Sequence, residues 1–340
     1  MQAYTLRELI RQGTLRLKQA GGESTRQEVE WLLGQCVGLR PLELYLQEPE
    51  FSKETVEQFF SHIEARARGV PLQYLLGEVE FYGMLFSIAP GVFIPRPETE
   101  QVVDAALKAF QSSVPSRTRR ISDLGFRSAD DSVANRLLKN ARDTQAAQKG
   151  ARRKAPLDSA EEARTKGLRL LDLGTGSGCI ALTLARFLPT CLVVGVEVSW
   201  LSLCVARLNA QRQGLTSQVH FVQGEWMDAI RGVFDGIIAN PPYIPTSEVA
   251  GLPLEVRQEP AISLDGGEDG MQALEHIMEQ APRLLKPAGL LVLECGQMQV
   301  DLLMKKAQAS FWVKSVRPIH DLAGYPRGLL IRSSQARFRA

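Results

Sequence analysis

The sequence predicts an α/β protein with a doubly wound, mostly parallel sheet, preceded by a small helical domain. Two observations support this prediction. After Gly167, short apolar strand-like runs alternate with helical segments, which is the pattern of strands joined by crossover helices. Before residue 76, apolar residues recur at helical spacing instead. The length of 340 residues fits about two domains of roughly 150 residues each.

Residues 1–75 are predicted to form the helical domain. Capping patterns that start at Thr5, Ser24 and Ser52 each precede an apolar stripe, which predicts three helices packed on a common core. A Val-, Phe- and Tyr-rich stretch within 76–97 then predicts a β-hairpin that links this domain to the next. The second domain is expected to span 98–340, with a helix beginning near Glu98 after two prolines.

Residues 112–167 differ in composition from their surroundings. They hold 13 Lys or Arg against 7 Asp or Glu, and their one aromatic residue is Phe126. Because such a stretch buries little apolar surface, we expect a flexible basic insertion. A basic loop could contact nucleic acid, but a solvated linker is the favoured interpretation.

The segment after Gly167 is predicted to build the sheet. We expect strands at 168–173, 192–196, 220–222, 234–239, 290–294 and 328–332, and helices at 179–188, 199–213 and 270–285. Helical crossovers between strands predict parallel pairing with right-handed connections. Ligands of such sheets bind at the carboxyl ends of the strands, so the residues that follow each strand are the candidates for a site.

Composition excludes several classes of protein. Apolar residues make up 44% and charged residues 23% of the chain, and the net charge is +2, which predicts no strong attraction to nucleic acid or to a membrane. We expect no membrane span, no signal peptide and a cytoplasmic location, because no apolar run approaches the ~18 residues a span requires. Five scattered cysteines without a CxxC pair, and four scattered histidines, predict neither a disulfide framework nor a metal site.

The first candidate site is a glycine-rich turn between the strand at 168–173 and the helix that follows. The turn consists of Gly174, Thr175, Gly176, Ser177 and Gly178. Glycines permit positive φ and a close approach of ligand to backbone. The spacing G-x-G-x-G differs from the dinucleotide fingerprint by one position, so a tight turn without a ligand is the alternative.

Two acidic positions follow the next strands. Glu197 ends the second strand, where a carboxylate can accept hydrogen bonds from both hydroxyls of a ribose. Glu225 and Trp226 follow the third strand and offer a carboxylate and an aromatic edge where an adenine would lie. With the turn, these residues predict a site for an adenosine-containing cofactor. No Lys follows the glycines as in a P-loop, which argues against a triphosphate.

The fourth strand runs into Asn240, Pro241, Pro242 and Tyr243. The two prolines hold the backbone extended, so that the Asn240 side-chain oxygen and the Pro241 carbonyl can accept both hydrogens of a planar amino group. Tyr243 can lie on the flat face of the same group. The arrangement suits methyl transfer onto an amide or exocyclic amino nitrogen, because orientation and two hydrogen bonds favour the pyramidal nitrogen of the transition state. A proline-rich strand end without a ligand is the alternative.

Together these motifs resemble the PrmC/HemK family of S-adenosyl-L-methionine-dependent methyltransferases, which modify the glutamine of the Gly-Gly-Gln tripeptide in class I peptide-chain release factors. The resemblance covers nearly the whole chain. It rests on Leu171–Leu182, Glu197, Asn240–Tyr243, the upstream FIPRPETE motif at Phe93–Glu100, and Leu264–Gly267. It implies a class I methyltransferase fold with a seven-stranded, Rossmann-like sheet, and an amino-terminal domain that docks the substrate protein.

The resemblance also implies roles for the candidate residues. Gly174–Gly178 would hold the methionine part of the cofactor, Glu197 the ribose, and Trp226 the border of the adenine. Asn240–Tyr243 would bind the substrate glutamine, with Asn240, Pro241 and Tyr243 as the catalytic group and Asn240 also near the cofactor. The implied partner is a release factor, with no metal, no membrane and no direct nucleic-acid contact. The family pattern has Asp where this chain has Glu197 and Glu225, so cofactor affinity could differ.

Three alternatives remain at this point. The first is a glutamine methyltransferase that acts on a ribosomal protein, with the same chemistry and a different docking surface. The second is a DNA or RNA adenine-N6 methyltransferase that uses the basic insertion, although no basic face interleaved with aromatic residues is apparent. The third is a cofactor-binding regulator without activity, which would have no use for the amide-binding segment that begins at Asn240.

Overall fold

The computed structural model describes residues 4–21, 26–112 and 167–334. Most of the predicted insertion and the predicted helix start at Ser24 lie outside these residues. Apart from 108–112, the described residues belong to one compact unit. No helix within the described ranges is long and apolar enough to cross a membrane.

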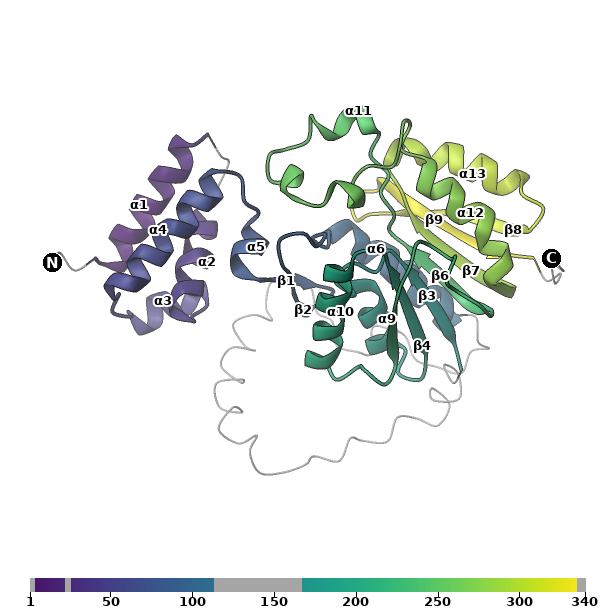
Figure 1. Ribbon diagram of the computed structural model, residues 1–340, viewed down its shortest axis with the longest axis horizontal. Coiled ribbons are helices and arrows are strands. Elements are labelled where there is room, and N and C mark those ends of the chain that lie inside the picture. The colour runs from purple at the N-terminus through teal and green to yellow at the C-terminus, as the bar shows by residue number, and fades with distance from the viewer. Residues whose placement is uncertain (1–3, 22–25, 113–166, 335–340) are drawn as a thin grey trace, which may run out of the picture. The chain divides into compact units, whose positions relative to one another are not determined.

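The amino-terminal region is helical, as predicted (Figure 1). Its helices are α1 (Leu6–Gln19), α2 (Arg26–Val37), α3 (Pro41–Gln47), α4 (Lys53–Ala67) and α5 (Leu72–Leu76). Thr5 and Ser52 cap α1 and α4 with their side-chain oxygens. Leu9, Leu33 and Phe59 belong to the buried core of this region. The sequence analysis missed α3 and α5, because seven and five residues are too few to show a helical period.

A hairpin and a long helix follow. The hairpin consists of β1 (Glu78–Phe81) and β2 (Met84–Ser87), which pair antiparallel, and the helix is α6 (Pro97–Ser112). Asn209, a buried residue of α10 (Trp200–Arg212), binds both backbone groups of Ser87: its Oδ1 accepts from the amide at 2.7 Å and its Nδ2 donates to the carbonyl at 3.1 Å. These bonds anchor the hairpin on α10.

The sheet has seven strands in the order β5-β4-β3-β6-β7-β9-β8. The strands are β3 (Arg169–Leu173), β4 (Leu192–Glu197), β5 (Val219–Gln223), β6 (Phe234–Ala239), β7 (Leu285–Glu294), β8 (Val313–His320) and β9 (Pro326–Ser333). The five strands from β5 to β7 pair in parallel, and β9 joins β7 and β8 antiparallel. The mostly parallel sheet is confirmed.

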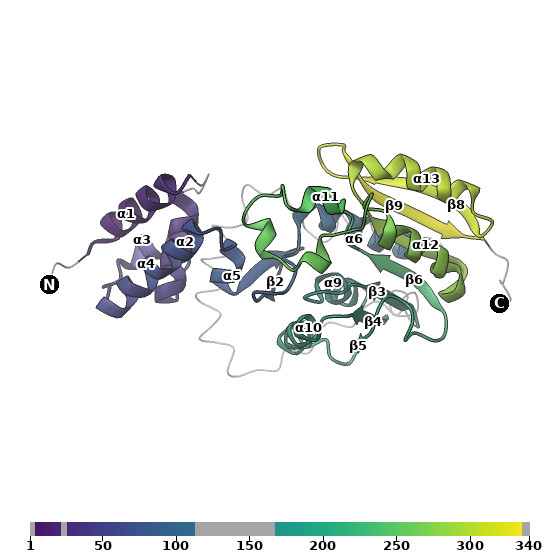
Figure 2. The same cartoon turned by 45° about the horizontal axis from the view of Figure 1, so that its top comes forward.

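Helices cover both faces of the sheet, which makes it doubly wound as predicted (Figure 2). On one side lie α9 (Cys179–Phe187) and α10, and on the other lie α12 (Gln272–Leu284) and α13 (Val300–Ala309). A short helix, α11 (Thr246–Val249), belongs to the long connection after β6. The buried core on the α12 and α13 side includes Leu171, Ile237 and Leu291, one from each of the three central strands.

The sequence analysis was incomplete at the carboxyl-terminal end of the sheet. It placed the start of β7 five residues too late, and it missed α13 and β8. In β8, which is an edge strand, most side chains are exposed or half-buried and Pro318 lies within the strand. Such a strand lacks the continuous apolar run by which the central strands were recognised.

The strand register determines where a site can form. Leu173 pairs with Ala239 of β6, which in turn pairs with Leu293 of β7, so β3, β6 and β7 end at the same level. The chain leaves β3 toward β4 on one side, whereas β6 lies on the other side of β3. This is the topological switch point of the sheet, where ligands of open α/β sheets bind. The glycine-rich turn follows the end of β3 at this point, and Asn240 follows the end of β6 beside it.

Candidate active site

The glycine-rich turn after β3 has the backbone that the sequence predicted. Gly174, Gly176 and Gly178 have φ of 69°, 55° and 83°, in the left-handed region that glycine adopts at little cost. A Cβ added at Gly174 or Gly176 would meet no atom closer than 4.0 Å, so the turn presents bare backbone to open space. At Gly178 a Cβ would instead come within 3.2 Å of Ala206, which shows that this glycine permits close packing of α10.

The two hydroxyl residues of the turn, Thr175 and Ser177, are buried, and the Ser177 Oγ has no hydrogen-bond partner within the described part of the chain. The Thr175 hydroxyl donates to Asp172 Oδ2 at 2.6 Å, and the Ala181 amide donates to the same oxygen at 3.1 Å. Burial raises the pKa of Asp172 to about 7, although these two bonds lower it. Its other oxygen, Oδ1, is buried and has no hydrogen-bond partner. The carbonyl of Ser177 accepts from Asn209 Nδ2 at 2.9 Å, so α10 holds the turn as well as the hairpin.

Glu197 reaches the glycine-rich turn from the end of β4. Its Oε2 accepts from the Gly176 amide at 3.0 Å and its Oε1 accepts from the Ser199 amide at 2.9 Å. A carboxylate has about four lone-pair sites, so each oxygen can accept a further hydrogen bond. Glu197 therefore fixes the turn and keeps acceptor capacity beside it.

Trp226 lies beside the same turn. Its half-buried ring packs on the core, and the Cζ3 atom is 4.0 Å from the position of a Cβ on Gly174. Trp226 itself has a φ of 43°, an uncommon value for a large residue. Glu225 is exposed. The predicted group is thus assembled around the turn, with Trp226 and Glu197 close to its glycines.

The segment after β6 is held from two sides. Asn240 is half-buried, and its Nδ2 donates to Thr99 Oγ1 at 3.0 Å. Tyr243 is half-buried as well and packs against the core. Burial and the nearby Glu294 carboxyl raise the pKa of the Tyr243 hydroxyl, so that this side chain stays neutral at physiological pH.

The Leu264–Gly267 motif supports the backbone of that segment. The Ile244 amide donates to the Leu264 carbonyl at 3.0 Å, and the Gly266 amide donates to the Ile244 carbonyl at 2.8 Å. A Cβ at Gly266 would lie 2.8 Å from the Pro242 carbonyl oxygen, so only glycine fits there without a shift. The side chain of Gln299 adds a bond from Nε2 to the Tyr243 carbonyl at 2.9 Å.

The Phe93–Glu100 motif supports the same segment from the other side. The Ile94 amide donates to Glu259 Oε2 at 2.9 Å, and Arg96 forms an ion pair with the same buried carboxylate. Thr99, which is 2% exposed, binds Asn240 as described. The Phe93–Glu100 motif therefore supports the Asn240–Tyr243 segment through Thr99. The sequence gives no reason to expect this contact, because Thr99 and Asn240 are 141 positions apart.

Four buried polar residues of this region were missed by the sequence analysis. They are Asp172, Thr99, Asn209 and Glu294, all at most 2% exposed. Thr99 and Asp172 stood inside motifs that were noted, but without a role. For Glu294 the only signal was an acidic residue directly after the apolar run Leu290–Leu293, and for Asn209, in a helix with several polar residues, there was no signal.

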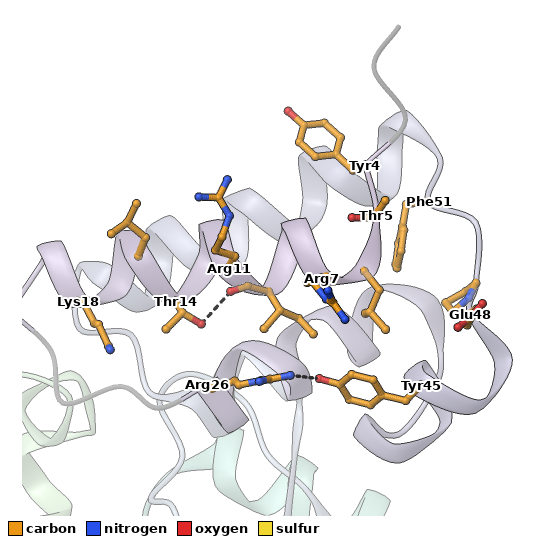
Figure 3. A pocket seen from close by; sticks show the side chains of 14 residues that line it. Tyr4, Thr5, Arg7, Arg11, Thr14, Lys18, Arg26, Tyr45, Glu48 and Phe51 are labelled. Carbon is orange, nitrogen blue, oxygen red and sulfur yellow. Dashed lines mark hydrogen bonds between the residues drawn. The ribbon is translucent and has the colours of Figure 1, made fainter.

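A pocket in the amino-terminal helices is separate from these residues (Figure 3). It has a volume of about 970 Å³ and is lined largely by α1, with none of the predicted site residues in its wall. Its charged lining consists of Arg7, Arg11, Lys18, Arg26 and one acidic residue, Glu48, and Tyr45 lies beside Arg26. Arg26 donates to the Tyr45 hydroxyl at 2.8 Å. Within the described ranges, no ion pair involves Arg7, Arg11 or Lys18.

The described part of the chain holds no cluster of three or more His, Cys, Asp or Glu side chains that could bind a metal ion. The five cysteines are free thiols. The polar groups that the fold gathers at the ends of β3, β4 and β6 are backbone amides, carboxylates and an amide side chain, which suit an organic ligand.

Comparison with known proteins identifies the family. Residues 8–77 match the PrmC N-terminal domain and residues 164–322 match a methyltransferase domain. A release factor glutamine methyltransferase of Moorella thermoacetica is 35% identical over 328 residues, which cover 96% of this chain and 98% of that protein. One of Bradyrhizobium diazoefficiens is 32% identical over 319 residues, which cover 93% and 91%.

Among solved structures, TrmN from Thermus thermophilus is 25% identical and overlaps with a TM-score of 0.37 over 51% of this chain and 47% of that one, too little to support a conclusion. The near full-length relatives are decisive, and they confirm the resemblance seen in the sequence. The chain is a methyltransferase and belongs to the release factor glutamine methyltransferase family.

Proposed function

We propose that this chain transfers a methyl group from S-adenosyl-L-methionine to the side-chain amide nitrogen of the glutamine in the Gly-Gly-Gln motif of class I release factors. Relatives in the family are named release factor glutamine methyltransferase, which supports the methylation of a release factor glutamine. We assign this activity to the cytoplasm, as the sequence leads us to expect. The observation that carries the proposal is the register of β3 and β6, which brings Asn240 next to the glycine-rich turn.

The residues around the turn fit the cofactor. The open space above Gly174 and Gly176 leaves room for the methionine part. The buried Oδ1 of Asp172 has no hydrogen-bond partner, and a ligand or a water molecule can supply the missing donor. Glu197 would accept from the ribose hydroxyls with its remaining lone pairs. Trp226 would border the adenine. When bound, the cofactor supplies an electrophilic methyl group on its sulfonium.

The residues that follow β6 would hold the substrate amide. Asn240 Oδ1 and the Pro241 carbonyl each accept one hydrogen of the glutamine NH2 group, and the backbone after Pro242 directs the Tyr243 ring onto its flat face. The lone pair of an amide nitrogen is delocalised, so the nitrogen is a weak nucleophile. Two fixed acceptors favour its pyramidal, partly positive form and hold it at attack distance. The nitrogen releases one proton to solvent after it gains the methyl group.

The amino-terminal helices would dock the body of the release factor, because a tripeptide alone offers too little surface for selective binding. Their exposed side chains Arg7, Arg11 and Lys18 supply positive charge at the pocket of Figure 3. We expect Arg7→Ala with Arg11→Ala to raise KM for the intact factor about three- to tenfold at constant kcat. Arg317→Ala, an exposed arginine of β8, is the matched control. An unchanged KM in the double variant would contradict docking at this pocket.

The proposed function is tested by methyl transfer from labelled S-adenosyl-L-methionine. The substrates are an intact release factor, its Gly-Gly-Ala variant, ribosomal proteins and adenine-rich duplex DNA, assayed in parallel. Label on the wild-type factor alone supports the proposal. Label on a ribosomal protein or on DNA instead would identify one of the alternative substrates and overturn it.

A further inference from the structure

We propose that Thr99 and Glu294 are positioning residues, which form a relay that holds the Asn240 side chain with its amide oxygen free for the substrate. The inference rests on the proposed function and deepens it. It assigns the Phe93–Glu100 motif, through Thr99, a role in orienting Asn240, in addition to its contribution to the packing of the fold. The three residues come from α6, from the end of β7 and from the segment after β6.

The relay begins with the orientation of the Asn240 amide. An asparagine side chain can be turned by half a rotation, which exchanges its donor nitrogen for its acceptor oxygen. Only one orientation serves the proposed chemistry, because the substrate NH2 group offers two donors and needs acceptors. Asn240 Nδ2 donates to Thr99 Oγ1 at 3.0 Å, so Oδ1 is on the branch that turns away from Thr99.

Thr99 can enforce this orientation only if its own proton is used elsewhere. A hydroxyl has one donor hydrogen and two acceptor lone pairs. The carboxyl of Glu294 lies level with Asn240 in the strand register, and a hydrogen bond from the Thr99 hydroxyl is among the causes that set the pKa of that carboxyl. When Glu294 is ionised it can only accept, so the Thr99 proton is directed to Glu294 and a lone pair is left for Asn240. If the Asn240 amide were turned by half a rotation, its Oδ1 would face the lone pair of Thr99 Oγ1, and neither atom would have a hydrogen to donate.

Glu294 is suited to the end of the relay by its place in the sheet. It follows Leu293, the partner of Ala239 in the register, and so lies level with Asn240. It is 2% exposed, and its Oε2 has no hydrogen-bond partner. Burial raises its pKa to about 7, whereas the Thr99 hydrogen bond lowers the pKa again. A buried carboxyl group with one oxygen that has no hydrogen-bond partner lowers the stability of the fold. A role in the reaction explains why such a group stands at this place.

The relay is tested by removing the Thr99 hydroxyl with little change of shape. We expect Thr99→Val to lower kcat about 10- to 100-fold, because the Asn240 amide then loses its fixed orientation. KM for the release factor and the Kd of S-adenosyl-L-methionine stay within twofold. Thr99→Ser restores most of the lost rate. Thr183→Val is the matched control, since Thr183 is also buried and its hydroxyl donates to the Cys179 carbonyl and to Met84 Sδ, neither of which belongs to the site.

A double-mutant cycle separates positioning from a merely structural role. In the Asn240→Ala background, Thr99→Val should have no further effect on kcat, because there is no amide left to orient. Glu294→Met should lower kcat in the wild-type background and have no effect on kcat in the Thr99→Val background. Thermal unfolding of each variant checks that the fold is intact.

The outcomes are distinct from those of the proposed function. If wild-type protein labels no release factor, the proposed function fails. If wild-type protein is active and Thr99→Val keeps its kcat, the relay is wrong. It is also wrong if Thr99→Val and Asn240→Ala reduce kcat additively, or if Thr99→Ser fails to restore the rate while the protein remains folded.

Discussion

The glycine-rich turn after β3 and the Asn240–Tyr243 segment after β6 meet at one edge of the sheet, but they keep their shapes by different means. The turn depends largely on its own backbone, with three glycines at positive φ, and on the adjacent elements β4 and α10, which supply Glu197 and Asn209. The Asn240–Tyr243 segment depends on residues from elsewhere, namely Thr99, Gln299 and the backbone around Gly266. Changes to the turn should therefore weaken cofactor binding, whereas changes around the segment should slow the reaction.

The largest effect is expected where the segment touches the substrate. Asn240→Ala should lower kcat about 10²- to 10³-fold, by analogy with the loss of one oriented hydrogen bond at a transition state. The Kd of S-adenosyl-L-methionine, measured by calorimetry, should change much less. An unchanged kcat would remove Asn240 from the mechanism, and a matching loss of cofactor affinity would mean that the two regions cannot be separated.

A smaller effect is expected from the backbone that supports the segment. Gly270 has a φ of 75°, and a Cβ there would lie 2.3 Å from the Tyr243 carbonyl oxygen. Gly270→Ala should displace Tyr243, lower kcat by about tenfold and cost ~1–3 kcal/mol of stability.

Gly324→Ala is the matched control for that substitution. Gly324 has a φ of 86° but nothing within 4 Å of an added Cβ, so it reports the backbone strain without the clash. Steady-state kinetics and chemical denaturation would be measured for both variants. Equal kcat in the two would show that the contact at Gly270 does not matter for the site.

On the cofactor side we expect a change of affinity alone. Glu197→Gln removes the negative charge and replaces one carboxylate oxygen by an NH2 group. This group cannot accept a hydrogen bond, so either the bond from the Gly176 amide or the bond from the Ser199 amide is lost. The Kd of the cofactor should rise about five- to tenfold, with kcat at saturating cofactor near the wild-type value. Calorimetry and kinetics would show this. A fall in kcat without a change in Kd would contradict the division between the two regions.

A further effect concerns stability and leaves both kcat and the Kd of the cofactor aside. Burial raises the pKa of Asp172 to about 7 from an ordinary value near 3.8. The folded protein therefore holds this proton more tightly than the unfolded chain does. The contribution of Asp172 to stability is fully present below pH ~4 and is lost as pH rises toward ~7. Asp172→Asn can keep both bonds to Oδ2 and should flatten this part of the pH profile of unfolding. An equally steep profile in the variant would show that Asp172 is ionised in the folded protein.

The difference between the two regions also explains what the sequence could predict. The turn was predictable because its three glycines fall within five consecutive residues, between a strand and a helix. Asn240–Tyr243 was predictable as a motif because its four residues are consecutive and directly follow a strand. Its supports were not, since Thr99 and Asn240 are 141 positions apart, and Asn209 and Ser87 are 122 apart. Pairing over such distances is decided by strand order and register, which propensities and spacing do not contain.

The central claim is that the site at the ends of β3 and β6 methylates a glutamine amide. Its most direct test is mass spectrometry of an intact release factor after incubation with the protein and S-adenosyl-L-methionine, with fragmentation to locate the methyl group. We expect one methyl group on the side-chain nitrogen of the Gly-Gly-Gln glutamine, formed about 10²- to 10³-fold more slowly with Asn240→Ala. A methyl group on another residue, or an unmodified factor, would contradict it.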